Sequence, residues 1–358
     1  MDCIKKLDEL VTLYSDELDI IKNITPVNLN QENEKFLELF HKNCEYNPQY
    51  IYEVNNKIDK IYNKIAEMTF ADSIIGRIYS SYKDYILNSI KLMNSINNVE
   101  SFTSKSISLF GKPDKDLINK AFKILKDDRT AIVDTCSFDA NFLYDTFIKE
   151  LEKYRFKWKV ELIDTMSSKV AVDAVNKTIY INACVKFSET DIKRLLVHEI
   201  GTHVVRAENG SQQPYLIFEN GFPNSIETEE GLATYNESKA NLLDIRTLKI
   251  YAGRVLAVDW CLNNSFYNVF FELSKYFEEK EALRIVSRIK RGLTDTSCNG
   301  GFTKDFVYLN GYYKIKKYIN KDNEILLYTG AIGIDDIDNV SRLVELGEIT
   351  LPRNIFNI

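Results

Sequence analysis

The sequence lacks the features that mark secreted, membrane-spanning and thiolate-metal proteins. Its first residues, MDCIKKLDELVTLY, contain no apolar h-region of a signal peptide, and no window approaches the roughly 18 consecutive apolar residues of a membrane span. The six cysteines are widely spread and form no C-x-x-C pair, so we expect neither a disulfide framework nor a thiolate zinc site. These absences predict a cytoplasmic protein with free thiols and no membrane partner.

Glycine and proline are also scarce, and the chain has no net positive charge. The 358 residues include 14 Gly and 6 Pro, with 45% hydrophobic and 27% charged residues, which is the composition of a helix-rich globular protein. The formal net charge of -6 argues against a nucleic-acid partner, which would favour a clustered basic face. The length exceeds one average domain, so one large domain or two unequal domains are expected.

Helices are predicted for most of the first hundred residues. Apolar residues recur at helical spacing in four segments: 3–14, 31–43, 50–70 and 72–93. The segment SFTSKSISLFGKPD, from Ser101 to Asp114, is predicted to be a linker. We therefore expect an N-terminal helical region, residues 1–105, and a second region, residues 106–358. The two are separate domains or one continuous body.

After Phe156 the pattern becomes short, β-branched and alternating, which predicts a small sheet. Its three expected strands are KWKVELID (157–164), SKVAVDAV (168–175) and KTIYINACVKF (177–187). Ser188 and Asp191 have the spacing of a capping box, so a helix should run from about Glu189 to Arg206. Thr228 is expected to cap the next helix. The predicted fold class is therefore α+β and rich in helix.

The segment LLVHEIGTHVV contains two of the three histidines of the chain. Zinc peptidases typically carry H-E-x-x-H, but here His198 and His203 are five residues apart, with Glu199 after the first. A regular helix would leave the two imidazoles roughly 140° apart, too far to chelate one ion. A one-residue π-bulge, made easier by Gly201, would return both to one face. The spacing therefore allows a variant zinc site, which an unbroken α-helix would exclude.

A catalytic zinc usually has three protein ligands and one open position. Zinc peptidases of the aminopeptidase type carry an N-E-G-F-A segment whose Glu before Gly binds the metal, and this chain has E-E-G-L-A. By that likeness Glu230 is the third ligand, Glu229 lies beside it, and Gly231 allows a close backbone approach. Each motif has an ordinary alternative. The two histidines and Glu199 could lie on a surface helix without binding a metal, and the two glutamates could be there because acidic residues stabilise the N-terminus of a helix. Both motifs in this order favour a metal site.

Four segments carry a resemblance to a known family. They are VHEIGTHVVR (197–206), Gln213-Pro214, TEEGLA (228–233) and GGFTKDFVYLNG (300–311), with weaker marks in NPQYIY (47–52) and FGKP (110–113). The chain resembles the tyrosine carboxypeptidase family that includes the vertebrate microtubule-associated tyrosine carboxypeptidases and bacterial QEGLA-motif proteins. Where bacterial members have Gln before E-G-L-A, this chain has Glu229, which leaves the presumed metal ligand intact.

The resemblance implies a zinc metallocarboxypeptidase with a gluzincin-like core that releases a C-terminal tyrosine or another aromatic residue. Zn²⁺ would be held by His198, His203 and Glu230, and Glu199 would be the general base. The vertebrate members act on the tail of α-tubulin. That substrate is not carried over, because the N-terminal region shows no basic microtubule-binding segment. The expected partner is a peptide or protein C-terminal tail, paired by edge addition with the strand KTIYINACVKF.

A carboxypeptidase also needs a cation for the terminal carboxylate of its substrate. Arg206, Arg291 and Lys304 lie in or near the family segments and are the candidates, with Arg254 a weaker one. Tyr308 is a candidate for the oxyanion or the pocket wall. The ordinary alternatives are surface charge for the cations and core packing for Tyr308.

Two other functions compete with this prediction, ahead of a third, nucleic-acid binding, which the acidic balance disfavours most. One is a zinc aminopeptidase or endopeptidase, which would need an acidic group for the substrate amine or an open cleft. The other is a helix-rich interaction protein in which the metal is structural or the motif is a relic. The intact set of His, Glu, His and Glu argues against a relic.

Overall fold

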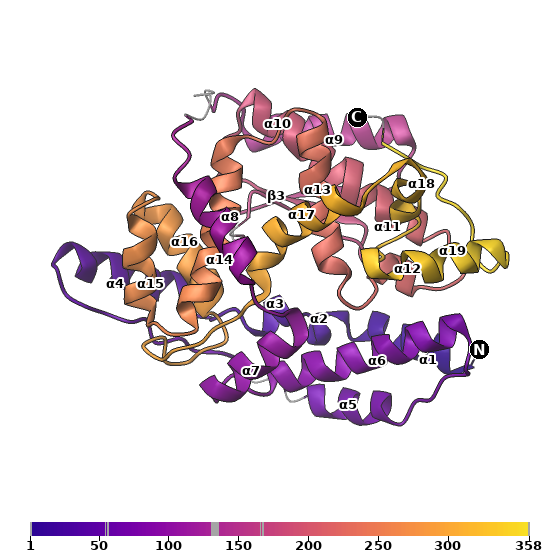
Figure 1. The fold of residues 1–358 in the computed structure, drawn as a ribbon, viewed down its shortest axis with the longest axis horizontal. Helices are drawn as coiled ribbons and strands as arrows, with labels where there is room; N and C mark the ends of the chain where they lie inside the picture. Colours follow the sequence, from indigo (N-terminus) through magenta and orange to yellow (C-terminus); the bar gives the residue numbers. More distant parts are fainter. Residues whose placement is uncertain are drawn as a thin grey trace. The chain divides into compact units, whose positions relative to one another are not determined.

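The computed structural model describes residues 2–53, 55, 57–129, 136–164, 166 and 168–356 (Figure 1). The chain forms two compact units, each built from two stretches of sequence. Unit 1 comprises Met1–Asp128 and Thr247–Leu309, and unit 2 comprises Arg129–Arg246 and Asn310–Ile358. The expected division after residue 105 stays a prediction. In the described part of the chain, no helix is both long and apolar enough to cross a membrane.

Unit 1 is built mainly from helices. They are α1 (Asp2–Leu13), α2 (Ser15–Leu18), α3 (Ile20–Asn23), α4 (Leu29–His41), α5 (Ile58–Ala66), α6 (Ile74–Met93), α7 (Val99–Phe110), α8 (Lys115–Leu125), α14 (Ile245–Cys261), α15 (Phe266–Ser274), α16 (Glu279–Lys290) and the short 3₁₀ helix η2 (Lys304–Phe306). Helices α1, α4 and α6 confirm three of the four predicted segments. The fourth yields only α5, and at the start of that segment the backbone N–H of Tyr50 bonds to the carbonyl of Thr294 instead of to a neighbouring turn.

The predicted linker is wrong, because most of it lies in α7. The Asn98 side chain caps this helix by accepting a hydrogen bond from the backbone N–H of Ser101. Phe102 is fully buried, and the buried Ser106 hydroxyl bonds to Thr303. The serines that suggested a loop are tolerated because apolar residues between them pack into the core. The helix ends only at Gly111, whose positive φ of 81° favours glycine.

Unit 2 combines a small sheet with helices. Its elements are α9 (Ala140–Tyr154), β1 (Lys159–Ile163), β2 (Val170–Asp173), β3 (Thr178–Asn182), α10 (Glu189–Leu195), the π-helix η1 (Leu196–Val204), α11 (Val205–Gly210), α12 (Ile217–Asn220), α13 (Ser225–Lys239), α17 (Val307–Tyr318), α18 (Lys321–Glu324), the 3₁₀ helices η3 (Leu326–Tyr328) and η4 (Ile334–Asp336), and α19 (Ile337–Glu345). The expected α+β class, rich in helix, is confirmed.

All three predicted strands are present in one mixed sheet with the order β1-β3-β2. Strand β3 pairs in parallel with β1 and antiparallel with β2, and its Ile179 and Ile181 are fully buried. Because β3 is the central strand, both of its edges are already hydrogen-bonded. The expectation that a substrate adds to the edge of this strand is therefore wrong. Helix α9 packs on β1 and β3, and β2 contacts η1, so the sheet supports the π-helix.

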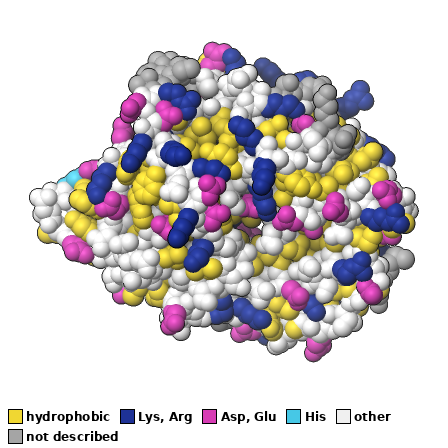
Figure 2. Space-filling model, viewed as in Figure 1, with side chains coloured by type: hydrophobic (Ala, Val, Ile, Leu, Met, Phe, Trp, Pro, Cys, Tyr) yellow, Lys and Arg dark blue, Asp and Glu magenta, His cyan; other side chains and the backbone are white. Residues whose placement is uncertain are grey.

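The surface carries charges of both signs. On the face drawn in Figure 2, Lys and Arg side chains lie among Asp and Glu side chains, with apolar patches between them. This mixed pattern is in keeping with the formal net charge of -6.

Candidate metal centre

The helix that carries both histidines begins with the predicted capping box. The Ser188 hydroxyl accepts a hydrogen bond from the backbone N–H of Asp191, and the Asp191 carboxylate accepts one from the backbone N–H of Ser188. After α10 the backbone widens into the π-helix η1 and then narrows again into α11. The predicted irregularity between His198 and His203 is therefore confirmed, as a π-helix of nine residues.

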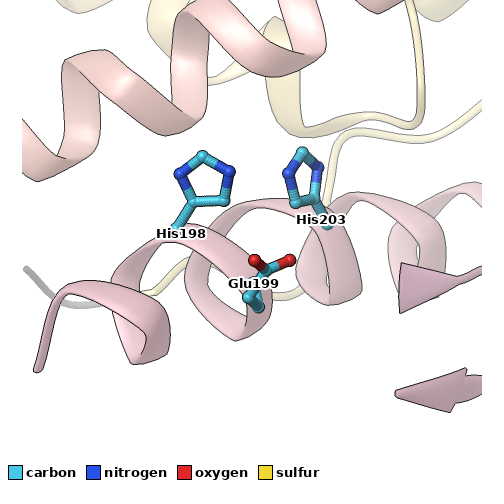
Figure 3. A group of neighbouring side chains, drawn as sticks. All are labelled: His198, Glu199 and His203. Atoms are coloured by element: carbon cyan, nitrogen blue, oxygen red, sulfur yellow. The ribbon is translucent and has the colours of Figure 1, made fainter. Parts of the chain in front are cut away.

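The π-helix turns both imidazoles to the same side of the backbone. Its i→i+5 hydrogen bonding places residues five apart above one another, as residues four apart are placed in an α-helix. Figure 3 shows the rings of His198 and His203 side by side, and their centroids lie 5.0 Å apart. Figure 3 also shows Glu199 on the same helix, beside the two rings. The H-E-x-x-x-H spacing thus gives the arrangement that H-E-x-x-H gives on a regular helix.

Four of the predicted site residues come together here. One possible ligand atom from each of His198, Glu199 and His203 lies within 4.8 Å of the others. His198 and Glu199 are buried, and His203 is half-buried. Glu230, on α13, places its Oε2 atom 3.8 Å from Nε2 of His198. Two imidazole nitrogens and a carboxylate are a donor set that suits a metal ion such as zinc.

Each imidazole is oriented by a second glutamate. Nδ1 of His198 lies 2.7 Å from Oε1 of Glu237, and Nδ1 of His203 lies 2.7 Å from Oε1 of Glu229. An ionised carboxylate can only accept, so each Nδ1 carries the proton and each Nε2 of the neutral ring has a free lone pair. Histidines that ligate metals are commonly held in this way. The tautomer that the site imposes is therefore the one that a metal needs.

Each orienting glutamate is in turn bound by an arginine. Nη1 of Arg194 donates to Oε1 of Glu237 over 2.8 Å, and Nη1 of Arg206 donates to Oε2 of Glu229. Glu237 is fully buried, and burial alone would raise the pKa of its carboxyl. Arg194 and His198 outweigh burial and lower that pKa. Arg194 thus helps to keep the Glu237 carboxylate ionised, and Arg206 forms an ion pair with Glu229.

The centre attracts positive charge strongly. Burial lowers the pKa of the His198 imidazole, but the neighbouring carboxylates, with Glu199 and Glu230 foremost, raise it to about 10. The pKa of His203 is also raised, because its carboxylate partner outweighs burial. A divalent cation in the same place would experience the same attraction and would displace these protons.

Two glycines allow close packing around the centre. A Cβ atom on Gly201 would lie 2.7 Å from the ring of Phe356, and one on Gly231 would lie 2.3 Å from the backbone of Gly311. The close approach expected at Gly231 is confirmed. The expected cap at Thr228 is wrong, because α13 begins at Ser225 and the Thr228 hydroxyl lies inside it, accepting the N–H of Ile334.

The residues predicted to bind the terminal carboxylate of a substrate lie in different surroundings. Arg206 is fully buried, and besides Glu229 it donates to the carbonyls of Leu327 and Ile332. Its guanidinium is thus engaged within the protein. Three other candidate residues lie in unit 1: Arg291 is buried at the end of α16, Lys304 is half-buried at the start of η2, and Tyr308 is half-buried on α17.

Sequence reasoning missed Glu237 and Arg194. Both have a recognisable spacing: Glu237 lies seven residues after Glu230, two turns along one face of α13, and Arg194 lies four residues before His198. Neither spacing is distinctive without the motif beside it. The pairing of the two helices is what brings these residues together.

The fold and the site together define a helix-rich α+β protein with a buried histidine–glutamate group that can hold a metal ion. The sequence model of the family described as microtubule-associated tyrosine carboxypeptidase matches residues 37–357, and the chain belongs to this family.

Three curated relatives show the extent of the similarity. The rat microtubule-associated tyrosine carboxypeptidase 1 is 31% identical over 170 residues, covering 45% of this chain and 35% of the rat protein. The human protein of that name is 32% identical over 158 residues, covering 42% and 32%. The human putative tyrosine carboxypeptidase MATCAP2 is 29% identical over 218 residues, covering 58% and 40%. The matched part is thus two fifths or less of each relative.

Proposed function

We propose that the chain is a zinc-dependent carboxypeptidase that releases a C-terminal tyrosine, or another aromatic residue, from a protein or peptide. One observation supports this proposal: the π-helix brings His198 and His203 together, and Glu230 of α13 lies 3.8 Å from Nε2 of His198, in a chain of a tyrosine carboxypeptidase family. Residues 106–358 would act as the catalytic region, with a gluzincin-like core, and residues 1–105 as a helical N-terminal region.

His198, His203 and Glu230 would hold the zinc ion. The set of two imidazoles and one carboxylate is that of catalytic zinc sites, which leave a fourth position open. A zinc ion supplies a Lewis acid that polarises the scissile carbonyl and lowers the pKa of water to about 7. Glu229 and Glu237 would hold the two rings in place through their Nδ1 atoms.

Glu199 would act as the general base. It follows the first histidine on η1, is buried, and lies within reach of the same point as the two rings. It would accept a proton from the attacking water and pass it to the leaving amine. The products are a free tyrosine and a polypeptide shortened by one residue, and no other reactant is needed.

The substrate would be a C-terminal tail with a free carboxylate. The names of the relatives refer to tyrosine and, for the rat protein, to microtubules. For this chain we propose only that the tail ends in tyrosine. Arg206, Arg291, Lys304 and Tyr308 remain the candidates for contacts with that residue. Because its guanidinium is already engaged, Arg206 is the least suited of the three cations.

Mass spectrometry on peptides that differ only in the last residue tests the proposal. Zinc-loaded protein should release Tyr or Phe, a chelator should abolish the release, and added zinc should restore it. Acetylating the peptide N-terminus should leave cleavage unchanged, whereas loss of cleavage would indicate an aminopeptidase. Cleavage at internal bonds would indicate an endopeptidase. No cleavage of any peptide would favour an interaction protein with a structural metal.

A further inference from the structure

Unit 1 contains a cluster of three arginines, and the described residues around it supply one carboxylate to neutralise them. Arg254 on α14 and Arg288 and Arg291 at the end of α16 surround one carboxylate, that of Asp305. Asp305 is 1% exposed and forms a two-pronged ion pair with Arg288, whose Nη2 lies 3.0 Å from Oδ1. Three guanidinium groups and one carboxylate leave two positive charges over.

Arg254 and Arg291 are the two surplus charges. They are 7% and 9% exposed, so both are more than nine-tenths buried. Among the described residues, Nε of Arg254 has no hydrogen-bond partner. Nε of Arg291 donates to the backbone carbonyl of Arg288, which carries no charge. Burial and the neighbouring Arg288 lower the pKa of Arg291 to about 10 and lower that of Arg254 as well.

Two stacked tyrosines line the same cluster. The rings of Tyr251 and Tyr308 are 5.2 Å apart and nearly parallel. The guanidinium carbon of Arg254 lies 4.5 Å from the centre of the Tyr308 ring and 5.4 Å from that of Tyr251. Stacking on rings holds a guanidinium in place but leaves its N–H groups available in the guanidinium plane. The side chain of Arg288 is 22% exposed and Tyr308 is half-buried, so the cluster reaches the surface there.

Two arginines of unit 2, the fully buried Arg206 and the half-buried Arg194, are both paired with carboxylates. Arg206 has a carboxylate and two carbonyls, and Arg194 has the carboxylate of Glu237. An unpaired buried charge destabilises a fold strongly. A fold that needed only packing at Arg254 would be more stable with an apolar side chain there. Since the described residues supply no hydrogen-bond partner for Nε of Arg254, an anion from outside the chain would fit this place.

We propose that Arg254, Arg288 and Arg291 bind a small oxyanion, with Tyr251 and Tyr308 as the wall of the site. Planar guanidinium groups match the two oxygens of a carboxylate or of a phosphate. The anion is either the terminal carboxylate of a tyrosine peptide, in which case the site rests on the proposed function, or a free inorganic anion. Asp305 holds Arg288 in place and is a positioning residue.

Binding measurements on zinc-loaded protein test the site with three probes. They are N-acetyl-tyrosine, N-acetyl-tyrosinamide and inorganic phosphate, each titrated by calorimetry against wild type and Arg254→Met. The substitution keeps an unbranched, flexible side chain and removes its charge. We expect it to weaken the binding of the preferred anion about tenfold to a hundredfold. Arg342→Met is the matched control, because Arg342 is 59% exposed and the charge change is the same.

The thermal midpoint separates a binding role from a structural one. If Arg254 is a surplus charge, Arg254→Met should melt at the same temperature as wild type or higher. Arg291→Met should likewise melt at the wild-type temperature or higher. Loss of folding in both variants would overturn the proposal, because a surplus charge is not needed for folding.

The probes identify the source of the anion. Arg254-dependent binding of N-acetyl-tyrosine, with none of the amide, supports the peptide carboxylate, and Arg254-dependent binding of phosphate alone supports a free anion. Equal binding by wild type and Arg254→Met for every probe overturns the site. If the protein nevertheless releases tyrosine, the proposed function stands without the anion site. If wild type releases no tyrosine but binds phosphate through Arg254, the site stands and the proposed function fails.

Discussion

At the scale of single residues, the centre divides its glutamates between two tasks. Glu199 has a possible ligand atom within 4.8 Å of one on each histidine, Oε2 of Glu230 lies 3.8 Å from Nε2 of His198, and Glu229 and Glu237 bind the Nδ1 atoms behind the rings. These positions predict different roles for four glutamates of the same chemistry. Substituting them by the isosteric amide separates those roles.

Glu199→Gln and Glu230→Gln should fail in different ways. Glu199→Gln should still bind about one zinc per chain but should release tyrosine about 10²- to 10⁴-fold more slowly, because the proton acceptor is lost. Glu230→Gln should bind zinc weakly and regain activity only at high zinc concentration. Plasma mass spectrometry for bound zinc, together with tyrosine release, measures both effects. If Glu199→Gln lost zinc and Glu230→Gln kept it, their roles would be exchanged.

Glu237→Gln should weaken the site although it touches no substrate. The amide can still contact Nδ1 of His198, but Arg194 loses its fully buried carboxylate partner. We expect zinc affinity to fall about 10- to 100-fold, as for other residues behind metal ligands. Competition with a chromophoric chelator measures the affinity. Glu345→Gln, which breaks only an exposed ion pair, is the control and should leave it unchanged.

At the scale of the elements, the position of the metal ligands depends on how η1 and α13 pack. Thr202 in η1 is fully buried, and its hydroxyl accepts a hydrogen bond from Asn236 of α13, which also donates to the Tyr328 hydroxyl. Gly231 lets α13 approach α17 closely. These contacts fix the distance between Glu230 and the histidines.

Gly231→Ala should destabilise the protein more than Gly201→Ala does. At Gly231 the new methyl group would lie 2.3 Å from a backbone carbon of Gly311, which cannot rotate away. At Gly201 it would meet the ring of Phe356 at 2.7 Å, and that ring can move. We expect losses of about 3 kcal/mol or more and of about 1 kcal/mol, respectively. Urea unfolding measures both, and equal losses would show that α13 and α17 can separate.

The sequence predicted the elements whose signals are local. The three strands, the capping box at Ser188 and the π-helix all follow from residues within one turn or one strand of each other. The predicted cap at Thr228 fails because α13 begins one turn earlier, at Ser225, after Asn224, which has a positive φ of 60° and makes no side-chain cap. The central place of β3 depends on pairing with β1, which no local pattern reports.

At the scale of the whole molecule, each of the two units contains one charged cluster, and the two clusters have opposite signs. The candidate metal centre of unit 2 has four glutamates against two arginines, and the cluster of unit 1 has three arginines against one aspartate. With both imidazoles neutral, as a bound metal requires, the imbalance in each case is two charges, counted over the named residues. A divalent cation would neutralise the first and an oxyanion would reduce the second. A chain with a modest net charge can thus hold two strongly charged sites.

The imbalance in unit 1 makes stability depend on pH through Asp305. Burial would raise the pKa of this carboxyl, but Arg288 and the other two arginines lower it far below its usual value. A carboxyl whose pKa is lower in the folded state stabilises the fold above its unfolded pKa of about 3.9, and this contribution is lost as the pH falls further. Asp305→Asn should therefore be less stable than wild type by about 3 kcal/mol at pH 7.

The difference between Asp305→Asn and wild type should shrink as the pH falls from 4 to 3, because wild type then loses the contribution that the variant lacks. Urea unfolding at each pH measures it, with Asp335→Asn as a control, since the Asp335 side chain is 81% exposed. Saturating phosphate gives a second comparison. An anion bound to the three arginines replaces part of the missing negative charge, so phosphate should stabilise Asp305→Asn more than Asp335→Asn. A variant as stable as wild type at pH 7 would show that the arginines do not depend on Asp305.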